Sequence, residues 1–374
     1  LVLHGKTPLP VVWNLRERNG DPPARQLISG TVSYGHRRLC PGPVTVPSAS
    51  NYLSTLRTRM VIADRRERMQ ALREGIARCS EELGVHPEED DELLDEVCDL
   101  VELPEPIVCR IPDEALDLPE PILITPMKVH QRYIPLRETD GKLSPWFIAV
   151  ANGQHDKEGR QTIREGNQRV LTARLRDAKY FWETDTRTPL EVFAQKLSRV
   201  MFHQELGTVA DKVQRLKNLY HRLNKHLPET NENDMVRLLD LMKADLTTQM
   251  VFEFDSLEGV VGMLYAQKEG IPEHIAKAIL EHRLPRRAGD ALPASALGTV
   301  AGLLDRFDTL AGYFGIGVRV KGTSDPYALR RNTLAVLSIL RAQQIDVDLA
   351  VCFRAAVENY TDKAWDTDKV VDSI

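Results

Sequence analysis

The stretch GNQRVLTARLRDAKYFW, residues 166–182, decides much of the fold because it predicts a helix with two unlike faces. At about 100° per residue, one face carries apolar side chains: Leu171, Leu175, Ala178 and Trp182. A second face, roughly 70–150° further round the axis, is largely basic: Arg169, Thr172, Arg176 and Lys179. The first face suits a hydrophobic core and the second suits anions such as a phosphate backbone. An ordinary solvated polar surface is the alternative interpretation.

The composition is that of a soluble globular protein. The chain has 374 residues, of which 42% are hydrophobic and 28% charged, so two or three domains are expected. No apolar run approaches the ~20 residues that cross a bilayer, and no membrane partner is expected. The chain starts at Leu1 without a leader, so we expect a fragment of a longer protein. The five cysteines are widely spaced without a Cys-x-x-Cys motif, which favours reduced thiols and a cytoplasmic location.

The formal net charge of −5 conceals a strong asymmetry along the chain. Residues 80–121 contain sixteen acidic residues and one basic residue, Arg110, so the rest of the chain carries a net charge of +10. A mildly acidic protein can therefore still bind nucleic acid through local basic patches. Within the acidic block we expect a helix that buries its apolar residues: Leu93, Leu94, Val97, Leu100 and Val101.

The sequence pattern predicts two domains. Residues 1–50 indicate strands and loops, residues 56–83 a helix ended by Gly84, and residues 107–111 a strand. Residues 131–151 indicate a hairpin turning at residues 139–142, with Pro135 on an edge strand. After about residue 187 helical spacing dominates, beginning with an apolar stripe over residues 190–201. We therefore expect an α+β fold, with a mixed α/β domain over 1–187 followed by an all-helical domain over 188–374.

Two further segments combine residues suited to nucleic acid. Residues 127–133 (MKVHQRY) place cations, an amide and an aromatic ring together, which suits phosphate contact and base stacking. The alternative interpretation of this segment is a polar edge with Tyr133 in the core. Residues 321–331 (KGTSDPYALRR) join a basic loop to a helix start capped by Asp325, where backbone N–H groups suit an anion. Their alternative is pairing of Arg330 and Arg331 with acidic neighbours.

A self-contained active site is hard to find in the sequence. No Gly-x-x-x-x-Gly-Lys-Ser/Thr loop and no His-Glu-x-x-His motif occur. His203, Asp245 and Asp305 fall on three different predicted helices, and such groups can converge on a hydrolytic metal. Ala244, however, stands beside Asp245 where a second histidine ligand is wanted. A metal-dependent phosphohydrolase is therefore the alternative to a nucleic-acid-binding protein, and a pure assembly scaffold is a third possibility.

Colinear motifs give the chain a family resemblance. They are SYGHR (33–37), MKVHQRY (127–133), GNQRVL (166–171), RLRDAKYF (174–181), FHQELGT (202–208), KADLTTQMVFEF (243–254), EGVVGMLYA (258–266), DRFDTLAG (305–312) and KGTSDPYALRR (321–331). In these motifs the chain resembles a central fragment of the beta subunit of the bacterial, heterotetrameric glycyl-tRNA synthetase.

The resemblance implies that aminoacylation and tRNA binding are carried out by two different subunits. A separate alpha subunit holds the aminoacylation core and uses glycine, ATP and Mg²⁺, while the beta subunit binds glycine tRNA and is needed for activity. The chain alone is then expected to be inactive and to hold no cofactor, catalytic residue or metal. Its first half resembles part of the tRNA-binding, editing-type domain of the phenylalanyl-tRNA synthetase beta subunit. Its second half resembles an HD phosphohydrolase domain and the start of the C-terminal helical region, and anticodon recognition lies outside it.

The sequence patterns and the resemblance together give two sets of candidate residues. The candidates for tRNA binding are Lys128, His130, Gln131, Arg132, Asn167, Arg169, Arg174, Arg176, Lys179, Lys321, Arg330 and Arg331. The candidates for a degenerate HD site are His203, Asp245 and Asp305, because the resemblance places the missing paired histidine at Ala244.

Overall fold

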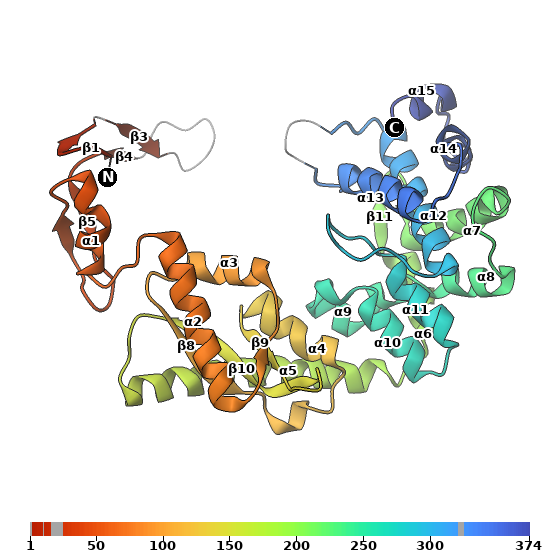
Figure 1. Ribbon diagram of the computed structural model, residues 1–374. Coiled ribbons are helices and arrows are strands. Elements are labelled where there is room, and N and C mark those ends of the chain that lie inside the picture. The colour runs from red at the N-terminus through yellow and green to blue at the C-terminus, as the bar shows by residue number, and fades with distance from the viewer. Residues whose placement is uncertain (1, 10, 16–24, 321–324) are drawn as a thin grey trace. The chain divides into compact units, whose positions relative to one another are not determined.

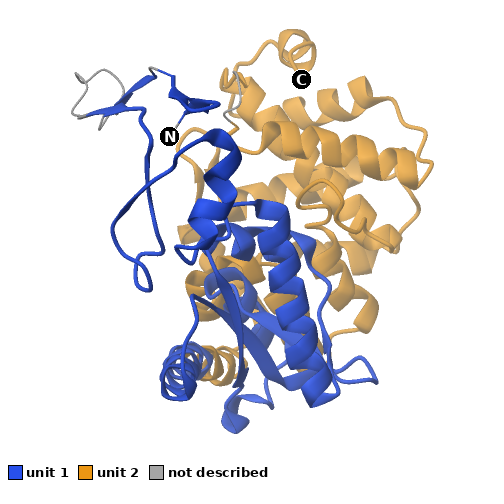
Figure 2. Ribbon diagram, turned by 60° about the vertical axis from the view of Figure 1, so that its left-hand side comes forward, with its two compact units in different colours: residues 1–176 blue, residues 177–374 orange. Residues whose placement is uncertain are grey.

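The computed structural model describes residues 2–9, 11–15, 25–320 and 325–374, and the chain divides into two compact units. Unit 1 comprises residues 1–176 and unit 2 comprises residues 177–374 (Figure 2). The fold class is α+β: unit 1 combines helices with a sheet, and unit 2 is mostly helical (Figure 1). The predicted boundary near residue 187 and the family assignment of each domain stay predictions. Among the described residues, no helix has the length and apolarity needed to span a membrane.

Unit 1 begins with short antiparallel strand pairs, as the pattern of residues 1–50 predicts. The pairs are β1 (Leu3–His4) with β2 (Thr7–Pro8), β3 (Val12–Leu15) with β4 (Arg25–Ile28), and β5 (Val32–Tyr34) with β6 (Pro43–Thr45). A 3₁₀ turn, η1 (Ala49–Asn51), then leads into helix α1 (Tyr52–Arg57).

The single helix predicted over residues 56–83 is wrong, because the chain forms two helices there. Helix α1 ends at Arg57, and Met60 takes a left-handed φ of 60°, which interrupts the helix. The second helix, α2 (Arg65–Leu83), begins where the Asp64 carboxylate accepts the N–H groups of Arg66 and Glu67. Gly84 ends α2 with a φ of 69°, as predicted.

A four-stranded antiparallel sheet forms the centre of unit 1. Its strand order is β7 (His86–Pro87), β9 (Ile134–Arg137), β10 (Leu143–Asn152) and β8 (Pro104–Arg110). The predicted hairpin is β9 and β10, and Gly141 in its turn has a φ of 85°. The prediction of an edge strand at Pro135 is wrong, since β7 pairs with β9 on its outer side. Pro135 has no N–H to donate to the sheet, but its carbonyl accepts the N–H of Glu88.

Helices cover both faces of this sheet. On one face, α2 and α3 (Asp91–Leu100) share a core with Ile134, Leu136 and Ile148. Side chains alternate along a strand, so Phe147 points to the opposite face. There it stacks on Tyr133, whose hydroxyl reaches Asn167 of α5 (Lys157–Asp185). The acidic helix is confirmed as α3, but Leu100, expected in the core, is 64% exposed because the helix ends there.

The helix predicted over residues 166–182 is confirmed as the longer helix α5. Leu171, Leu175 and Ala178 are fully buried, while Arg169 and Arg176 are exposed. Two short segments precede the hairpin: helix α4 (Glu120–Thr125) and a π-helical turn, η3 (Pro126–His130), which holds Lys128 and His130.

Unit 2 packs helices around α12 (Ala296–Gly315), an almost wholly apolar helix that is buried on most sides. The other helices are α6 (Leu190–Gln195), α7 (Val209–Leu223), α8 (Glu232–Leu241), α9 (Gln249–Glu253), α10 (Val260–Lys268), α11 (Glu273–Glu281), α13 (Leu329–Ala342), α14 (Leu349–Glu358) and α15 (Thr367–Val371). Helices α7, α8, α11, α13, α14 and α15 all contact α12. The polar groups of α12 therefore need partners from its neighbours.

The expectation that the second half is entirely helical is not met. The stripe over residues 190–201 forms only α6 and a 3₁₀ turn, η4 (Lys196–Arg199), after which Val200 is extended. Two short strands follow, β11 (Met201–His203) and β12 (Gly207–Thr208). His203 therefore lies on a strand and not on a helix. The Thr208 side chain then forms a capping box with Asp211 at the start of α7.

All five cysteines are free thiols, as their spacing predicts. Cys98 and Cys109 are buried in unit 1 and Cys352 is buried in unit 2. Burial raises the pKa of the Cys109 thiol to about 12 and that of Cys352 to about 11.

Candidate functional site

The basic residues before the hairpin of unit 1 are held by acidic neighbours. The Lys128 ammonium lies 2.8 Å from Glu88 and 2.5 Å from Asp90. The Arg132 guanidinium lies 2.5 Å from Glu96. Glu88, Asp90 and Glu96 belong to the acidic segment 80–121. Their carboxylates therefore neutralise the positive charges of Lys128 and Arg132, which the sequence predicts as phosphate contacts.

The other residues of the segment 127–133 divide between surface and core. His130 is exposed and takes part in an interaction within the protein, and Gln131 is half-buried. Tyr133 is buried against Phe147, with ring centroids 4.8 Å apart, and its hydroxyl donates to the Asn167 side chain at 2.8 Å. Its ring is therefore packed in the core and is not available to stack on a base. The alternative interpretation with Tyr133 in the core is the correct one.

Helix α5 offers positive charge at fewer positions than its sequence suggests. Asn167 is engaged with Tyr133 and also donates to the carbonyl of Ile163. Arg176 lies 2.7 Å from Glu114. Arg174 and Lys179 are half-buried and have interaction partners of their own. Arg169 is exposed and makes no ion pair with any residue that the structure describes.

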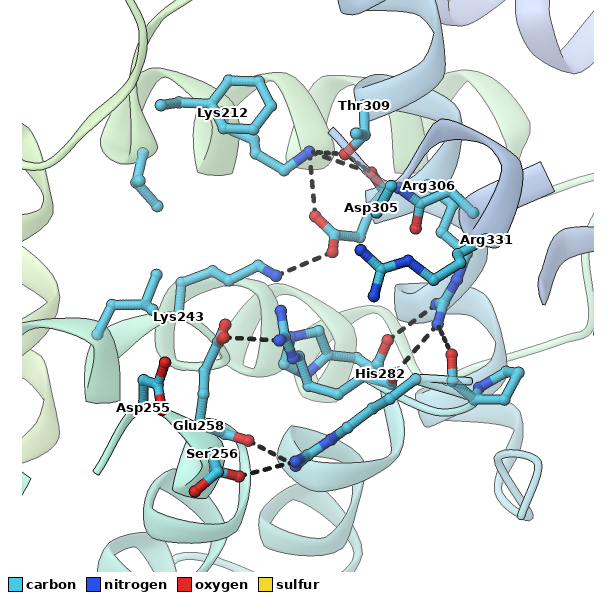
Figure 3. A pocket seen from close by; sticks show the side chains of 18 residues that line it. Lys212, Lys243, Asp255, Ser256, Glu258, His282, Asp305, Arg306, Thr309 and Arg331 are labelled. Carbon is cyan, nitrogen blue, oxygen red and sulfur yellow. Dashed lines mark hydrogen bonds and ion pairs between the residues drawn. The ribbon is translucent and has the colours of Figure 1, made fainter. Parts of the chain in front are cut away.

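A second basic region, which sequence reasoning missed, is a cavity of about 650 Å³ inside unit 2 (Figure 3). Lys212 reaches it from α7, and Lys243 from the turn before η5 (Ala244–Thr247). His282 and Arg283 reach it from the end of α11. Helix α12 contributes Asp305, Arg306 and Thr309, and α13 contributes Arg331. Arg286, Glu258 and Asp255 also line it.

Asp305 is the centre of an ion cluster in this cavity. Its carboxylate lies 2.8 Å from the Lys243 ammonium and 3.1 Å from that of Lys212. Burial by itself favours the neutral acid, but the two ammonium groups hold the pKa of Asp305 well below its usual range. The Lys212 ammonium also contacts Asp308 at 3.0 Å, and Asp308 lies 2.7 Å from Arg215. Asp305 is thus ionised and already paired.

The three residues of the expected HD site do not come together. His203 packs edge-on against Tyr313, and its Nδ1 accepts the N–H of Glu205. The fully buried Asp245 accepts the N–H groups of Gly259 and Gly262. Only Asp305 lines the cavity. Within the described ranges, no group of three or more His, Cys, Asp or Glu side chains is placed to hold a metal ion, so the phosphohydrolase alternative finds no support.

The remaining candidates lie at or beyond the start of α13. Lys321 falls outside the described residues. Helix α13 begins at Leu329 and not at Pro326, although Asp325 accepts the N–H groups of Leu329 and Arg330. Arg330 is exposed and has an interaction partner. Arg331 is also exposed and lines the cavity of unit 2.

One sequence signal did point to the cavity. Lys212 follows Val209 by three residues and precedes Leu216 by four, so it lies on the buried face of α7. A lysine on an apolar helix face needs a buried acidic partner. The sequence does not reveal which acid that is, because Asp305 and Asp308 are more than ninety residues away.

Comparisons with known proteins identify the family. The family model described as glycyl-tRNA synthetase beta subunit matches residues 9–374. The chain belongs to this family. It is 40% identical over 349 residues to the glycine–tRNA ligase beta subunit of Clostridioides difficile, covering 93% of this chain and 50% of that protein. The corresponding proteins of Moorella thermoacetica and Pseudomonas aeruginosa are 41% and 40% identical, each over 90% of this chain and 48% of the relative. The chain thus spans about half the length of these curated relatives.

Proposed function

We propose that this chain is the central part of a glycine–tRNA ligase beta subunit that binds glycine tRNA and supports its ATP-dependent glycylation. The observation that carries the proposal is the family match over residues 9–374. In this proposal the glycylation reaction takes place in an alpha subunit, which binds glycine, ATP and Mg²⁺, and the complex works in the cytoplasm. The absence of a nucleotide-binding loop from the sequence agrees with this division.

For the two units we propose the domains that the family resemblance implies. Unit 1 corresponds to part of an editing-type, tRNA-binding domain, and its antiparallel sheet covered by helices is compatible with that assignment. Unit 2 corresponds to an HD-like domain followed by the start of the C-terminal helical region. Lysines surround Asp305 in place of histidine or carboxylate ligands, which favours an HD fold retained without hydrolysis.

Among the tRNA-binding candidates of unit 1, Arg169 is the strongest. It is exposed on α5 and its charge is not neutralised by an ion pair with a described residue. The paired residues Lys128, Arg132 and Arg176 contribute less, because each must leave a carboxylate before it contacts a phosphate.

Arg169→Ala tests this proposal in the full-length beta subunit assembled with its alpha subunit. We expect tRNA affinity to fall about three- to tenfold and the slope of log affinity against log salt to become shallower by about one or less. Fluorescence titration with labelled tRNA at several salt concentrations measures both quantities, and glycylation assays report the effect on the reaction.

Arg78→Ala is the matched control, because Arg78 is also an exposed helical arginine but lies on α2, on the opposite face of the sheet. It should leave both the affinity and the slope unchanged. Equal behaviour of the two variants would remove Arg169 from the tRNA contact. Glycylation that proceeds normally without the beta subunit would overturn the proposed function as a whole.

A further inference from the structure

The cavity of unit 2 holds more positive charge than its own carboxylates balance. Six of its lining residues are basic: Lys212, Lys243, Arg283, Arg286, Arg306 and Arg331. Three are acidic: Asp255, Glu258 and Asp305. Burial, and then the neighbouring Arg283, lower the pKa of Lys243, and burial lowers the pKa of Arg306 to about 10. An unbalanced buried charge of this kind is costly, and an anion in the cavity offsets the cost.

Several basic side chains around the cavity carry N–H groups that are not all engaged in hydrogen bonds with described residues. Among the described residues, the Lys243 ammonium contacts one carboxylate, that of Asp305, although it carries three N–H groups. Arg283 pairs with Glu258 through one terminal nitrogen, while its buried Nε has no hydrogen-bond partner in the described part of the chain. Arg331 is exposed at the rim and forms no ion pair with a described residue. These groups can bind an oxyanion without breaking an existing pair.

His282 adds an acceptor to this set of donors. Its ring is 1% exposed, and its Nδ1 faces the carbonyl of Ile279 at 2.5 Å. A carbonyl only accepts, so Nδ1 carries the hydrogen and Nε2 of the neutral ring has a free lone pair. Within the described residues Nε2 has no partner, although it is buried in the lining of the cavity. A suitable ligand therefore carries a donor hydrogen as well as anionic oxygens.

Part of the wall of the cavity is apolar. Phe202, Val209 and Leu246 line it and belong to one hydrophobic cluster. The volume of about 650 Å³ lies in the range of small-molecule sites, and is larger than a bare inorganic anion needs. The combination of a cationic end and an apolar wall matches a phosphate group attached to an organic body.

We propose that this cavity binds a phosphate monoester of mononucleotide size, held by lysine and arginine side chains and not by a metal ion. Lys243, Arg283 and Arg331 contact the phosphate oxygens, and the protonated phosphate oxygen donates to Nε2 of His282. A phosphate monoester has a second pKa of about 6, so near neutral pH it supplies that hydrogen at little cost. A sulfate ester carries the same single negative charge as the monoprotonated phosphate monoester but has no hydrogen to donate.

The test uses the full-length beta subunit in complex with its alpha subunit and adenosine 5′-monophosphate as the probe. Calorimetric titration should show saturable binding that persists in EDTA and exceeds the binding of adenosine 5′-sulfate. Arg331→Ala should weaken binding about tenfold, as expected for the loss of one charge-assisted contact. Arg341→Ala, another exposed arginine on α13 that does not line the cavity, should leave binding unchanged.

Lys243→Met tests the buried end of the site, with circular dichroism as the check on folding. A folded Lys243→Met variant that binds the probe normally would overturn the proposal, as would equal effects of the two α13 variants. Loss of binding in EDTA would also overturn it, since the proposed site needs no metal. Absence of any binding at millimolar concentrations of adenosine 5′-monophosphate would also overturn the proposal.

Competition identifies the source of the monoester. A tRNA that carries a 5′-terminal phosphate and the same tRNA after dephosphorylation are each added against the bound probe. Displacement by the phosphorylated form alone assigns the cavity to the RNA terminus, and displacement by neither assigns it to a free nucleotide. Equal displacement by both forms contradicts recognition of the monoester. Loss of this binding leaves the tRNA contact at Arg169 untouched, so the two proposals fail independently.

Discussion

The basic residues of unit 1 and those around the cavity of unit 2 are engaged in opposite ways. In unit 1, Lys128, Arg132 and Arg176 each meet a carboxylate of the acid-rich segment before the hairpin. In unit 2, two lysines share the carboxylate of Asp305, and within the described residues Arg306 donates to backbone carbonyls such as that of His282 and forms no ion pair. A cluster of basic residues in a sequence is therefore a weaker indication of anion binding than the number of acidic side chains that surround each basic residue in the structure.

The difference between buried and exposed pairs predicts the largest effect. Asp308 is fully buried and contacts both Lys212 and Arg215, so Asp308→Asn leaves the buried Arg215 without its acidic partner and Lys212 with Asp305 alone. We expect the free energy of unfolding to fall by about 3–5 kcal/mol. Asp113→Asn in unit 1 is the control, because its exposed pair with Arg110 contributes about 1 kcal/mol or less. Chemical denaturation measures both, and equal losses would contradict the distinction.

A pH effect of intermediate size is expected at Asp245. Burial raises its pKa to about 6, above the 3.8 of an ordinary aspartate, so the folded state binds the proton more tightly than the unfolded state. The stabilisation is complete below about pH 4 and is lost as the pH rises through 6, a change of about 3 kcal/mol. Asp245→Asn should remove this decline, which denaturation curves at pH 4 to 7 would show. A decline that persists in the variant would place its origin elsewhere.

The smallest effect concerns the pairing in unit 1 itself. Glu114→Gln frees Arg176 on the surface of α5, and we expect tRNA binding to strengthen about twofold at low salt and less at high salt. Glu165→Gln is the control: it removes a negative charge from the same helix, where Glu165 accepts a hydrogen bond from Gln161. If both variants strengthen binding equally, net charge and not the release of Arg176 explains the gain.

Local periodicity allowed the sequence to predict much of the fold. The buried face of α5 followed from the spacing of Leu171, Leu175 and Ala178, and the end of α2 followed from Gly84. The predictions failed where distant partners decide the outcome. Pro135 indicated an edge strand, but the chain before α3 supplies β7 as its neighbour. The sequence predicted His203 on a helix, yet the pairing of β11 with β12 makes it part of a strand.

The candidate site was less predictable for the same reason. The cavity of unit 2 exists because α7, α12 and α13 converge, and no local pattern joins Lys212 to Asp305 or Arg331. The HD-like residues were placed by resemblance, but in the structure Asp245 accepts the N–H groups of Gly259 and Gly262 and does not line that cavity. The acids that neutralise Lys128 were visible in the sequence, although their contact with it was not.

The distribution of buried thiols has a consequence for how opening of the protein can be followed. Thiolates are the forms that react with alkylating reagents, and the high pKa values of Cys109 and Cys352 keep both thiols protonated at neutral pH. Each therefore reacts only when its surroundings open and water reaches it. Because one lies in unit 1 and the other in unit 2, alkylation rates at these two cysteines would report the local stability of each unit separately, without any engineered label.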